Sequence, residues 1–262
     1  MELTSIIGII IGIISIIVAM FFKQISFSVF YNPAALVVIF VGTCASVLNS
    51  FTGRELKNLG HLFRLIFTTG KKSSVGTVKY LSELSVVVRK DGVLALEPMI
   101  SGVNDPFLRK GMQMIIDGSK SEFIVEVLSM EIAEMEERHS DNANIFASAG
   151  TYAPTLGVLG AVFGLIAAMA HIDNTAYMSD AIAAAFIATI LGIFTGYVMW
   201  NPFATKLKLK SKYEAREKRL IIEGILSIQN GESPQILVDR LKAMLPYSEQ
   251  RLIENELQGG GA

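Results

Sequence analysis

The sequence predicts an all-α integral membrane protein with four transmembrane helices, a helical cytoplasmic domain between helices 2 and 3, and a helical C-terminal tail. Of its 262 residues, 51% are hydrophobic and only 18% are charged, whereas a soluble protein carries about a quarter charged residues. Four blocks contain no Asp, Glu, Lys or Arg at all: 3–22, 33–51, 145–170 and 181–200. Each block is long enough to cross a hydrocarbon core about 30 Å thick as a helix.

These features exclude several classes of protein. The single cysteine, Cys44, excludes a disulfide scaffold, and we expect it only to pack within its helix. A net charge of −1 without a concentrated basic groove argues against nucleic-acid binding. There is no Gly-rich nucleotide-binding motif, and the three histidines lie far apart in the sequence. We therefore expect neither an enzyme nor a bound cofactor or metal.

The first block has the length of a membrane helix rather than the features of a secretory signal peptide. It begins without a basic residue, its apolar run is long and rich in Ile, and no small-residue cleavage site follows Phe22 and Lys23. We expect 3–22 to remain in the protein as the first span, followed by a short external link and the second span at 33–51.

Basic residues predict the orientation, because Lys and Arg that flank membrane spans stay in the cytoplasm. Of the 23 Lys and Arg residues, 12 lie in 52–144, 10 lie in 203–262, and Lys23 is the remaining one. The link at 171–180 has two Asp and no basic residue. We therefore expect both termini and the large loop to be cytoplasmic and the two short links to be external.

Helical spacing of apolar residues predicts the cytoplasmic elements. The chain should divide into four parts, which are 1–51, 52–144, 145–202 and 203–262. Within the cytoplasmic parts, the predicted helices are 75–88, 107–117, 121–137, 206–229 and 234–244, with loops at Gly- and Pro-containing segments. This is enough apolar material for a small helical subdomain but too little for an independent enzyme domain.

Spans three and four carry small residues every four positions, whereas spans one and two are bulky. Such spacing lets helix backbones approach closely, so we expect spans three and four to line the interior of an assembly. Packing between helices by itself also explains the pattern. The residues expected to pack against a partner helix are Gly157, Gly160, Gly164, Ala184, Ala188 and Gly192, and the span-four series continues to Gly196.

Polar groups are sparse in these two spans. Thr155 and Thr189 either donate back to a carbonyl one turn earlier or face a hydrated path. Pro154 removes an amide donor, which predicts a kink or hinge, and Pro202 marks the inner end of span four. A proton relay needs a titratable group at depth, and this chain supplies none. Either the chain carries no ions or a partner helix supplies the acid, and the small-residue interior favours the partner.

Several motifs accompany the four-span order with its large loop. They are Tyr31–Ile39 (YNPAALVVI), Arg89–Glu97 (RKDGVLALE), Ala153–Gly157 (APTLG), Ala188–Gly192 (ATILG) and Asn201–Thr205 (NPFAT). In this order they resemble the MotA family, which comprises the larger stator subunits of bacterial flagellar motors. The MotA family is part of the MotA/TolQ/ExbB proton channel family. The TonB- and Tol-system relatives share the pattern of spans three and four but have three spans, so the extra N-terminal span argues against them.

The resemblance implies a ring in the bacterial inner membrane, with five copies of the chain around two copies of a MotB-like single-span partner. The partner contributes an intramembrane Asp, and proton flow through that Asp turns the ring. The resemblance places Arg89, Lys90 and Glu97 at the rotor protein FliG, although a solvated surface pair explains Arg89 and Glu97 equally. It assigns Pro154, Thr155, Thr189 and Pro202 to the ion path and its coupling.

Ala161 bears on which ion is carried. Sodium-type relatives have a threonine seven residues after the span-three proline, where this chain has Ala161. A Na⁺ ion must exchange its water shell for several oxygens, and a methyl group supplies none, so the sequence predicts H⁺.

Two other functions stay open at this point. One is an ExbB/TolQ-like energiser of an envelope protein, and the other is a passive membrane scaffold or channel. A neighbouring gene for a single-span protein with an intramembrane Asp would favour the stator.

Overall fold

The computed structural model describes residues 2–26, 30–68 and 74–259, and every regular element among them is a helix. Four of these helices are long and apolar enough to cross a membrane. The predicted all-α, four-span class is therefore confirmed. The chain divides into two compact units, one formed by Met1–Thr69 with Arg138–Lys210 and the other by Gly70–Glu137 with Ser211–Ala262.

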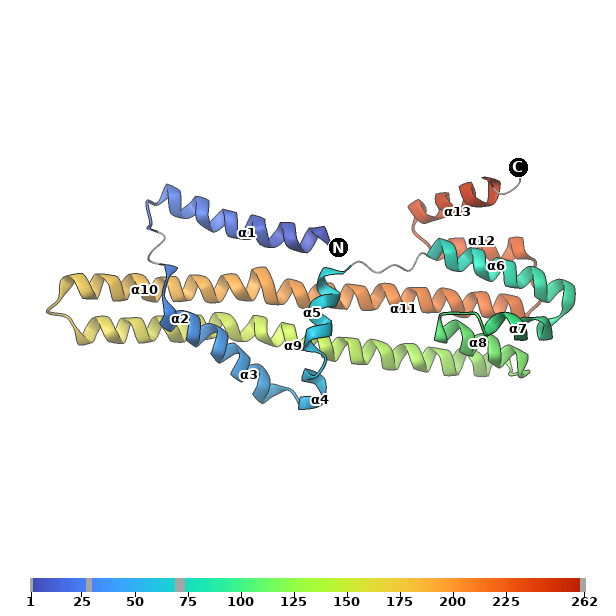
Figure 1. Ribbon diagram of the computed structural model, residues 1–262, viewed down its shortest axis with the longest axis horizontal. Coiled ribbons are helices and arrows are strands. Elements are labelled where there is room, and N and C mark those ends of the chain that lie inside the picture. The colour runs from blue at the N-terminus through green and yellow to red at the C-terminus, as the bar shows by residue number, and fades with distance from the viewer. Residues whose placement is uncertain (1, 27–29, 69–73, 260–262) are drawn as a thin grey trace. The chain divides into compact units, whose positions relative to one another are not determined.

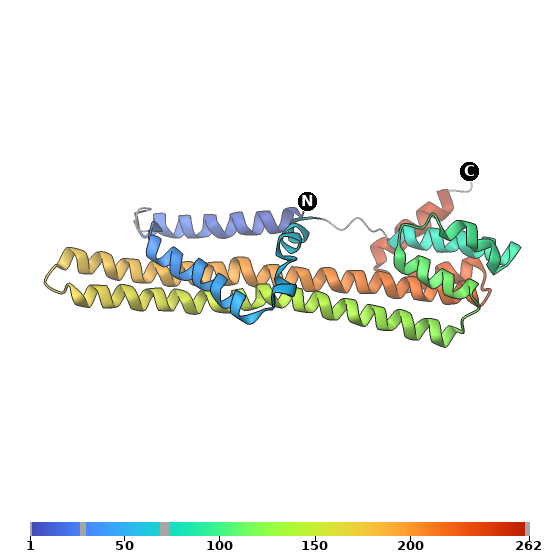
Figure 2. The same ribbon diagram turned by 60° about the horizontal axis from the view of Figure 1, so that its bottom comes forward.

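The first unit contains the four apolar spans (Figure 1). Its first span is α1 (Leu3–Phe22), and its second is built from α2 (Pro33–Leu36), the π-helical η2 (Val37–Val41) and α3 (Gly42–Ser50). Two short helices follow, α4 (Gly53–Leu56) and α5 (Leu59–Phe67). The remaining spans are the later part of α9 (Ser121–Ala170), and α10 (Thr175–Phe194) with the π-helical η4 (Thr195–Trp200). In the views of Figures 1 and 2 alike, α9 and α10 run side by side.

The second unit is a helical bundle with its own core. It contains α6 (Ser74–Asp91), the 3₁₀ helix η3 (Val93–Leu96), α7 (Glu97–Ile100) and α8 (Pro106–Ile116), with the first part of α9. The later part of α11 (Asn201–Gln229), α12 (Pro234–Ala243) and α13 (Tyr247–Gly259) complete it. Leu81, Met112, Leu128 and Ile225 are fully buried in this core. The residues come from four helices, so burial of apolar surface holds these short elements together.

Side-chain caps explain where several helices begin. Asn32 and Asn174 accept hydrogen bonds from the backbone amides of Ala35 and Tyr177, which starts α2 and α10. Asp105 accepts from the amide of Phe107, and the next residue is a proline, as is common in a first helical turn. These short polar residues satisfy amide donors that have no partner inside the helix.

The predicted boundaries at 144/145 and 202/203 fall inside helices, and the four-part division by membrane topology stays a prediction. The predicted helix 121–137 and span 145–170 are a single helix, α9, and α11 begins at Asn201. Segments 52–69 and 138–144 belong to the first unit rather than to a separate loop domain. The reason is that no Gly or Pro lies between residues 137 and 145 to end the helix. Loss of charge marks entry into an apolar environment, and a helix can continue through that change.

Several elements were not predicted. Helices α4, α5, α7 and α13 have no counterpart among the predicted helices, and neither π-helical segment was predicted. A π segment holds one additional residue in a turn, which periodicity in an apolar run does not reveal.

Candidate functional site

The glycines of α9 and α10 face each other within the chain. A methyl group placed on Gly157 would lie 2.9 Å from the Cα of Gly192 and 2.9 Å from the carbonyl oxygen of Ala188. One placed on Gly164 would lie 2.9 Å from the Cβ of Ala185. The two backbones therefore touch, and only residues without a side chain fit at these crossings.

The second span contacts part of the small-residue surface at two places. The open side of Gly160 faces the Cβ of Ala188, at 3.2 Å, and a methyl of Val38 in η2, at 3.9 Å. Asn32, besides capping α2, donates a hydrogen bond of 3.3 Å to the carbonyl oxygen of Ala184. Asn32 was quoted in a motif but given no role, and this contact shows that it ties span two to span four.

These contacts lie within one chain, and packing against a partner helix stays a prediction for Gly157, Gly160, Gly164, Ala184, Ala188 and Gly192. Their neighbours in the structure belong to the same chain, and Ala188 and Gly192 are buried there. The spacing of small residues in a sequence shows that another helix can pack closely against them. It does not show which helix packs there.

The two span threonines hydrogen-bond to their own helices. The hydroxyl of Thr155 donates to the carbonyl of Tyr152 at 2.8 Å, and that of Thr189 donates to the carbonyl of Ala185 at 3.3 Å. Thr155 is exposed on α9, Thr189 is half-buried on α10, and Ala161 is half-buried. Both hydroxyl groups therefore donate to a carbonyl of their own helix, as one of the two alternatives predicts. Their oxygen atoms can still accept hydrogen bonds.

Pro154 lies inside α9 and contacts span four. A methyl group on Gly196, in η4, would lie 2.7 Å from the Cγ of Pro154 and 2.8 Å from the carbonyl oxygen of Gly150. That carbonyl is the one that a proline at 154 leaves without its usual amide donor. The side chain of Asn201 occupies the open side of Gly150. The structure thus brings Pro154 to the segment that leads into Pro202, which is exposed in the first turn of α11.

The residues assigned to the rotor lie at a bend in the second unit. Arg89 and Lys90 are in the last turn of α6, and Glu97 begins α7. Gly92, with φ 82° and ψ 171°, separates the two helices. A continuous helix would place Arg89 and Glu97 about two turns apart, but Gly92 interrupts the helix between them. All three charged side chains are exposed, and none forms an ion pair within the described part of the chain.

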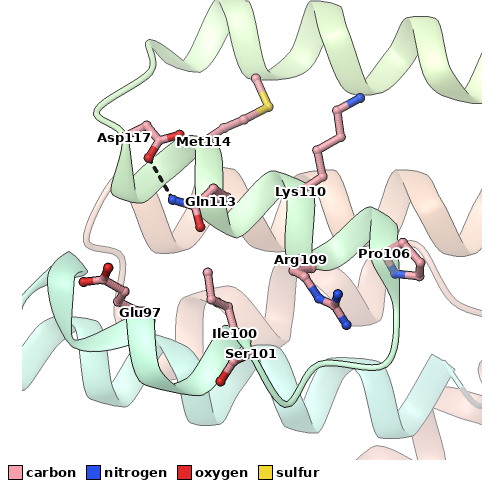
Figure 3. Close-up of a pocket in the computed structure, with 9 residues that line it drawn as sticks. All are labelled: Glu97, Ile100, Ser101, Pro106, Arg109, Lys110, Gln113, Met114 and Asp117. Atoms are coloured by element: carbon pink, nitrogen blue, oxygen red, sulfur yellow. Dashed lines mark hydrogen bonds between the residues drawn. The ribbon is translucent and has the colours of Figure 1, made fainter.

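Glu97 also lies at the edge of a hollow between α7 and α8 (Figure 3). The hollow has a volume of about 680 Å³ and is open to solvent. Two of its charged groups already have partners within the chain. Lys110 pairs with Glu131 at 2.8 Å, and Asp117 accepts a hydrogen bond from Gln113 at 2.8 Å. Its lining is Glu97, Ile100, Ser101, Pro106, Arg109, Lys110, Gln113, Met114 and Asp117.

A charged cluster in the first unit joins three segments outside the spans. The Glu2 carboxylate pairs with Lys206 at 2.8 Å and with Lys210 at 3.7 Å, and Lys210 also donates to the carbonyls of Leu65 and Thr68. The hydrogen bond from Lys206 lowers the pKa of Glu2, with partial burial opposing it and the charges of both lysines adding to it. Partial burial lowers the pKa of Lys210, although the charge of Glu2 opposes that shift.

Comparison with known proteins gives consistent matches along the chain. Residues 100–220 match the MotA/TolQ/ExbB proton channel family. Motility protein A of Bacillus subtilis is 46% identical over 251 residues, which cover 95% of this chain and 93% of that protein.

Two solved structures have the same fold. The flagellar MotAB stator complex from Bacillus subtilis contains a chain that is 46% identical and matches with a TM-score of 0.90, covering 96% of this chain and 98% of that chain. A chain of C. jejuni MotAB is 28% identical and matches with a TM-score of 0.89, covering 94% and 97%.

Proposed function

This chain belongs to the MotA/TolQ/ExbB proton channel family, and on that premise we propose that it is a stator subunit of a bacterial flagellar motor. With a MotB-like partner, it couples inward proton flow to torque on the rotor. The observation that carries this function is the match of a single chain, over 96% of its length, to a chain of a solved flagellar stator complex.

The lack of an acid in the four apolar blocks supports the need for a partner. The four charge-free blocks contain no Asp or Glu, so a partner helix must bring the carboxylate that carries the proton. The stoichiometry proposed from the family is five copies of this chain around two copies of the partner, in the bacterial inner membrane. Both termini and the second unit face the cytoplasm, as the distribution of Lys and Arg supports.

The first experiment tests the function directly. The chain and its cognate MotB-like partner are expressed together in a flagellated strain that lacks its own stator subunits. Swimming should return, and it should be abolished when the partner's intramembrane Asp is changed to Asn. If both proteins reach the membrane but neither co-purify nor restore swimming, the proposal is wrong. Restoration of a TonB- or Tol-dependent process instead would identify an envelope energiser.

Rotor contact through Arg89, Lys90 and Glu97 is supported by their exposure near the α6–α7 bend, where none of them pairs with a described residue. Arg89→Glu should reduce swimming while membrane level and partner co-purification stay unchanged. Lys79→Glu is the matched control, because Lys79 is an exposed basic residue on the same helix. Loss of assembly by Arg89→Glu would assign Arg89 a folding role, and an equal defect in Lys79→Glu would show that only net charge matters.

The proposed ion is H⁺, because Ala161 provides no oxygen ligand. Swimming speed should follow the proton motive force and should not change when external Na⁺ is replaced by K⁺ at constant proton motive force. A speed that depends on Na⁺ under those conditions would contradict proton coupling.

A further inference from the structure

We infer that Gly150, Gly196 and Asn201 are positioning residues that transmit movement of α9 at Pro154 to the π-helical segment η4 and, through it, to α11. The inference rests on the proposed function, because it concerns how protonation of the partner's carboxylate reaches the rest of the chain.

The first step is the contact between Pro154 and Gly196. A methyl on Gly196 would lie 2.7 Å from the Cγ and 2.8 Å from the Cδ of the proline ring, which are distances that side chains do not tolerate. The ring therefore rests directly on the backbone of η4, with no flexible side chain between them. A displacement of the ring toward Gly196 must displace η4 as well, because packed interiors do not compress.

The second step is the conformation of η4. A π-helical segment is a local irregularity in a helix and is frequent at functional sites. The hydroxyl of Thr195 donates to the carbonyls of Leu191 and Gly192, at 2.8 and 3.1 Å, which satisfies backbone acceptors where η4 begins. Thr195 is itself buried. The irregular turn is thus held by a specific side chain, and it lies beside the turn of α9 that Pro154 interrupts.

The third step is a second contact on the same turn of α9. The side chain of Asn201, the first residue of α11, occupies the space beside Gly150, where a side chain would clash with it. Gly150 is one helical turn before Pro154, and Asn201 comes directly after η4. Two contacts therefore join the proline turn to both ends of the same short segment, one at Gly196 and one at Asn201.

The chain contains a spectroscopic reporter of this segment. Trp200 is the last residue of η4 and the only tryptophan. Its ring centroid lies 6.2 Å from that of Phe63 and 6.3 Å from those of Phe146 and Phe203. A movement of η4 against this aromatic cluster should change the emission of Trp200.

The experiment uses the full chain bound to its partner, with any tryptophan in the partner changed to phenylalanine. Emission is recorded across the titration of the partner's carboxylate, beside swimming speed. The unsubstituted chain should show a shift that the partner's Asp→Asn variant lacks. Gly196→Ala should co-purify with the partner yet lose both the emission shift and most of the torque. Gly8→Ala is the control, because a methyl at Gly8 has no neighbour within 4 Å.

Two further variants keep the inference testable if Gly196→Ala fails to assemble. Asn201→Ala adds no atoms, so it should assemble, and it should reduce the emission shift and the torque together. Pro154→Ala combined with Asn201→Ala should behave as Pro154→Ala alone, because both side chains act through the same turn of α9; coupled residues give such non-additive effects.

Three results would overturn the inference. They are an assembled Gly196→Ala or Asn201→Ala chain with an unaltered emission shift and torque, additive losses in the double variant, and no emission shift in the unsubstituted complex. These outcomes differ from failure of the proposed function, in which the unsubstituted chain would not restore swimming with its partner.

Discussion

At the residue scale, glycines determine how closely α9 and α10 pack, because they have no side chain. A methyl on Gly192 would lie 2.7 Å from the carbonyl oxygen of Ala153 and 2.8 Å from the Cα of Gly157. In an apolar solvent there is little hydrophobic drive between helices, so close backbone packing is a main source of association. The glycines therefore stabilise this helix pair inside one subunit.

Gly157→Leu should separate α9 from α10 and destabilise the isolated chain by about 1–3 kcal/mol or more, the usual cost of overpacking. Gly8→Leu is the control, since Gly8 has open space around it. Thermal stability of the chain purified without its partner measures the effect. If Gly157→Leu kept normal stability and lost only partner binding, the original expectation of a partner-facing Gly157 would be correct.

Glu2 offers a pH-dependent prediction. Its pKa lies below the ordinary value of 4.5, because Lys206 binds the charged form. Such a group stabilises the fold above its unfolded pKa, and the contribution is lost as the pH falls through the lowered pKa. Glu2→Gln should therefore lower the stability at neutral pH by at most about 1 kcal/mol, a typical value for a partly exposed pair.

Thermal unfolding of both forms, in detergent, at neutral pH and at several pH values below 4.5, measures this difference. The two forms should converge in acid. A difference that persists at the lowest pH would show that Glu2 acts through packing rather than through charge.

At the element scale, Gly92 lies where α6 has ended and the 3₁₀ helix η3 begins. Its φ of 82° and ψ of 171° lie in a region that essentially only glycine occupies. The bend places Arg89 and Glu97 on different helices, so the arrangement of the three exposed charges depends on one backbone conformation.

Gly92→Ala should cost about 1–3 kcal/mol of stability, because Ala is strained in this conformation. It should also reduce swimming by changing how Arg89 and Glu97 are presented. Gly76→Ala is a control in the first turn of α6; it meets no neighbour within 4 Å, and Ala there should not destabilise the protein. Circular dichroism melts and swimming assays measure both effects. Equal behaviour of the two variants would remove the special role of Gly92.

At the scale of the whole molecule, the inside-positive distribution of charge predicts the orientation of every segment. Cys44 is the only cysteine, so a Cys44→Ala chain can carry single new cysteines. Asp173→Cys lies in the predicted external link, and Tyr213→Cys lies in the predicted cytoplasmic part of α11; both native residues are exposed.

A membrane-impermeant maleimide added to intact cells should label Asp173→Cys and leave Tyr213→Cys unlabelled until the cells are opened. Swimming of the Cys44→Ala background serves as the control for folding. Labelling of Tyr213→Cys in intact cells would reverse the proposed topology.

Much of the candidate site was found from motifs, but its contacts were not. Pro154, Pro202 and the threonines were identified before the structure, whereas the roles of Asn32, Gly150 and Asn201 were missed. Asn32 and Asn201 each precede a proline within a quoted motif, which was a usable signal. Gly150 carried no signal, because its role depends on the side chain of a residue about fifty positions away.

The sequence by itself determined that the chain is helical and has four spans, and it predicted which ends are cytoplasmic. Hydropathy and charge indicate the environment of each residue separately, so spans and orientation can be predicted without knowing which residues are in contact. Only the tertiary structure decided that 121–170 is one helix, that glycines of spans three and four contact each other, and that Pro154 rests on Gly196. Those features depend on which distant segments meet, and close packing admits a single arrangement of them.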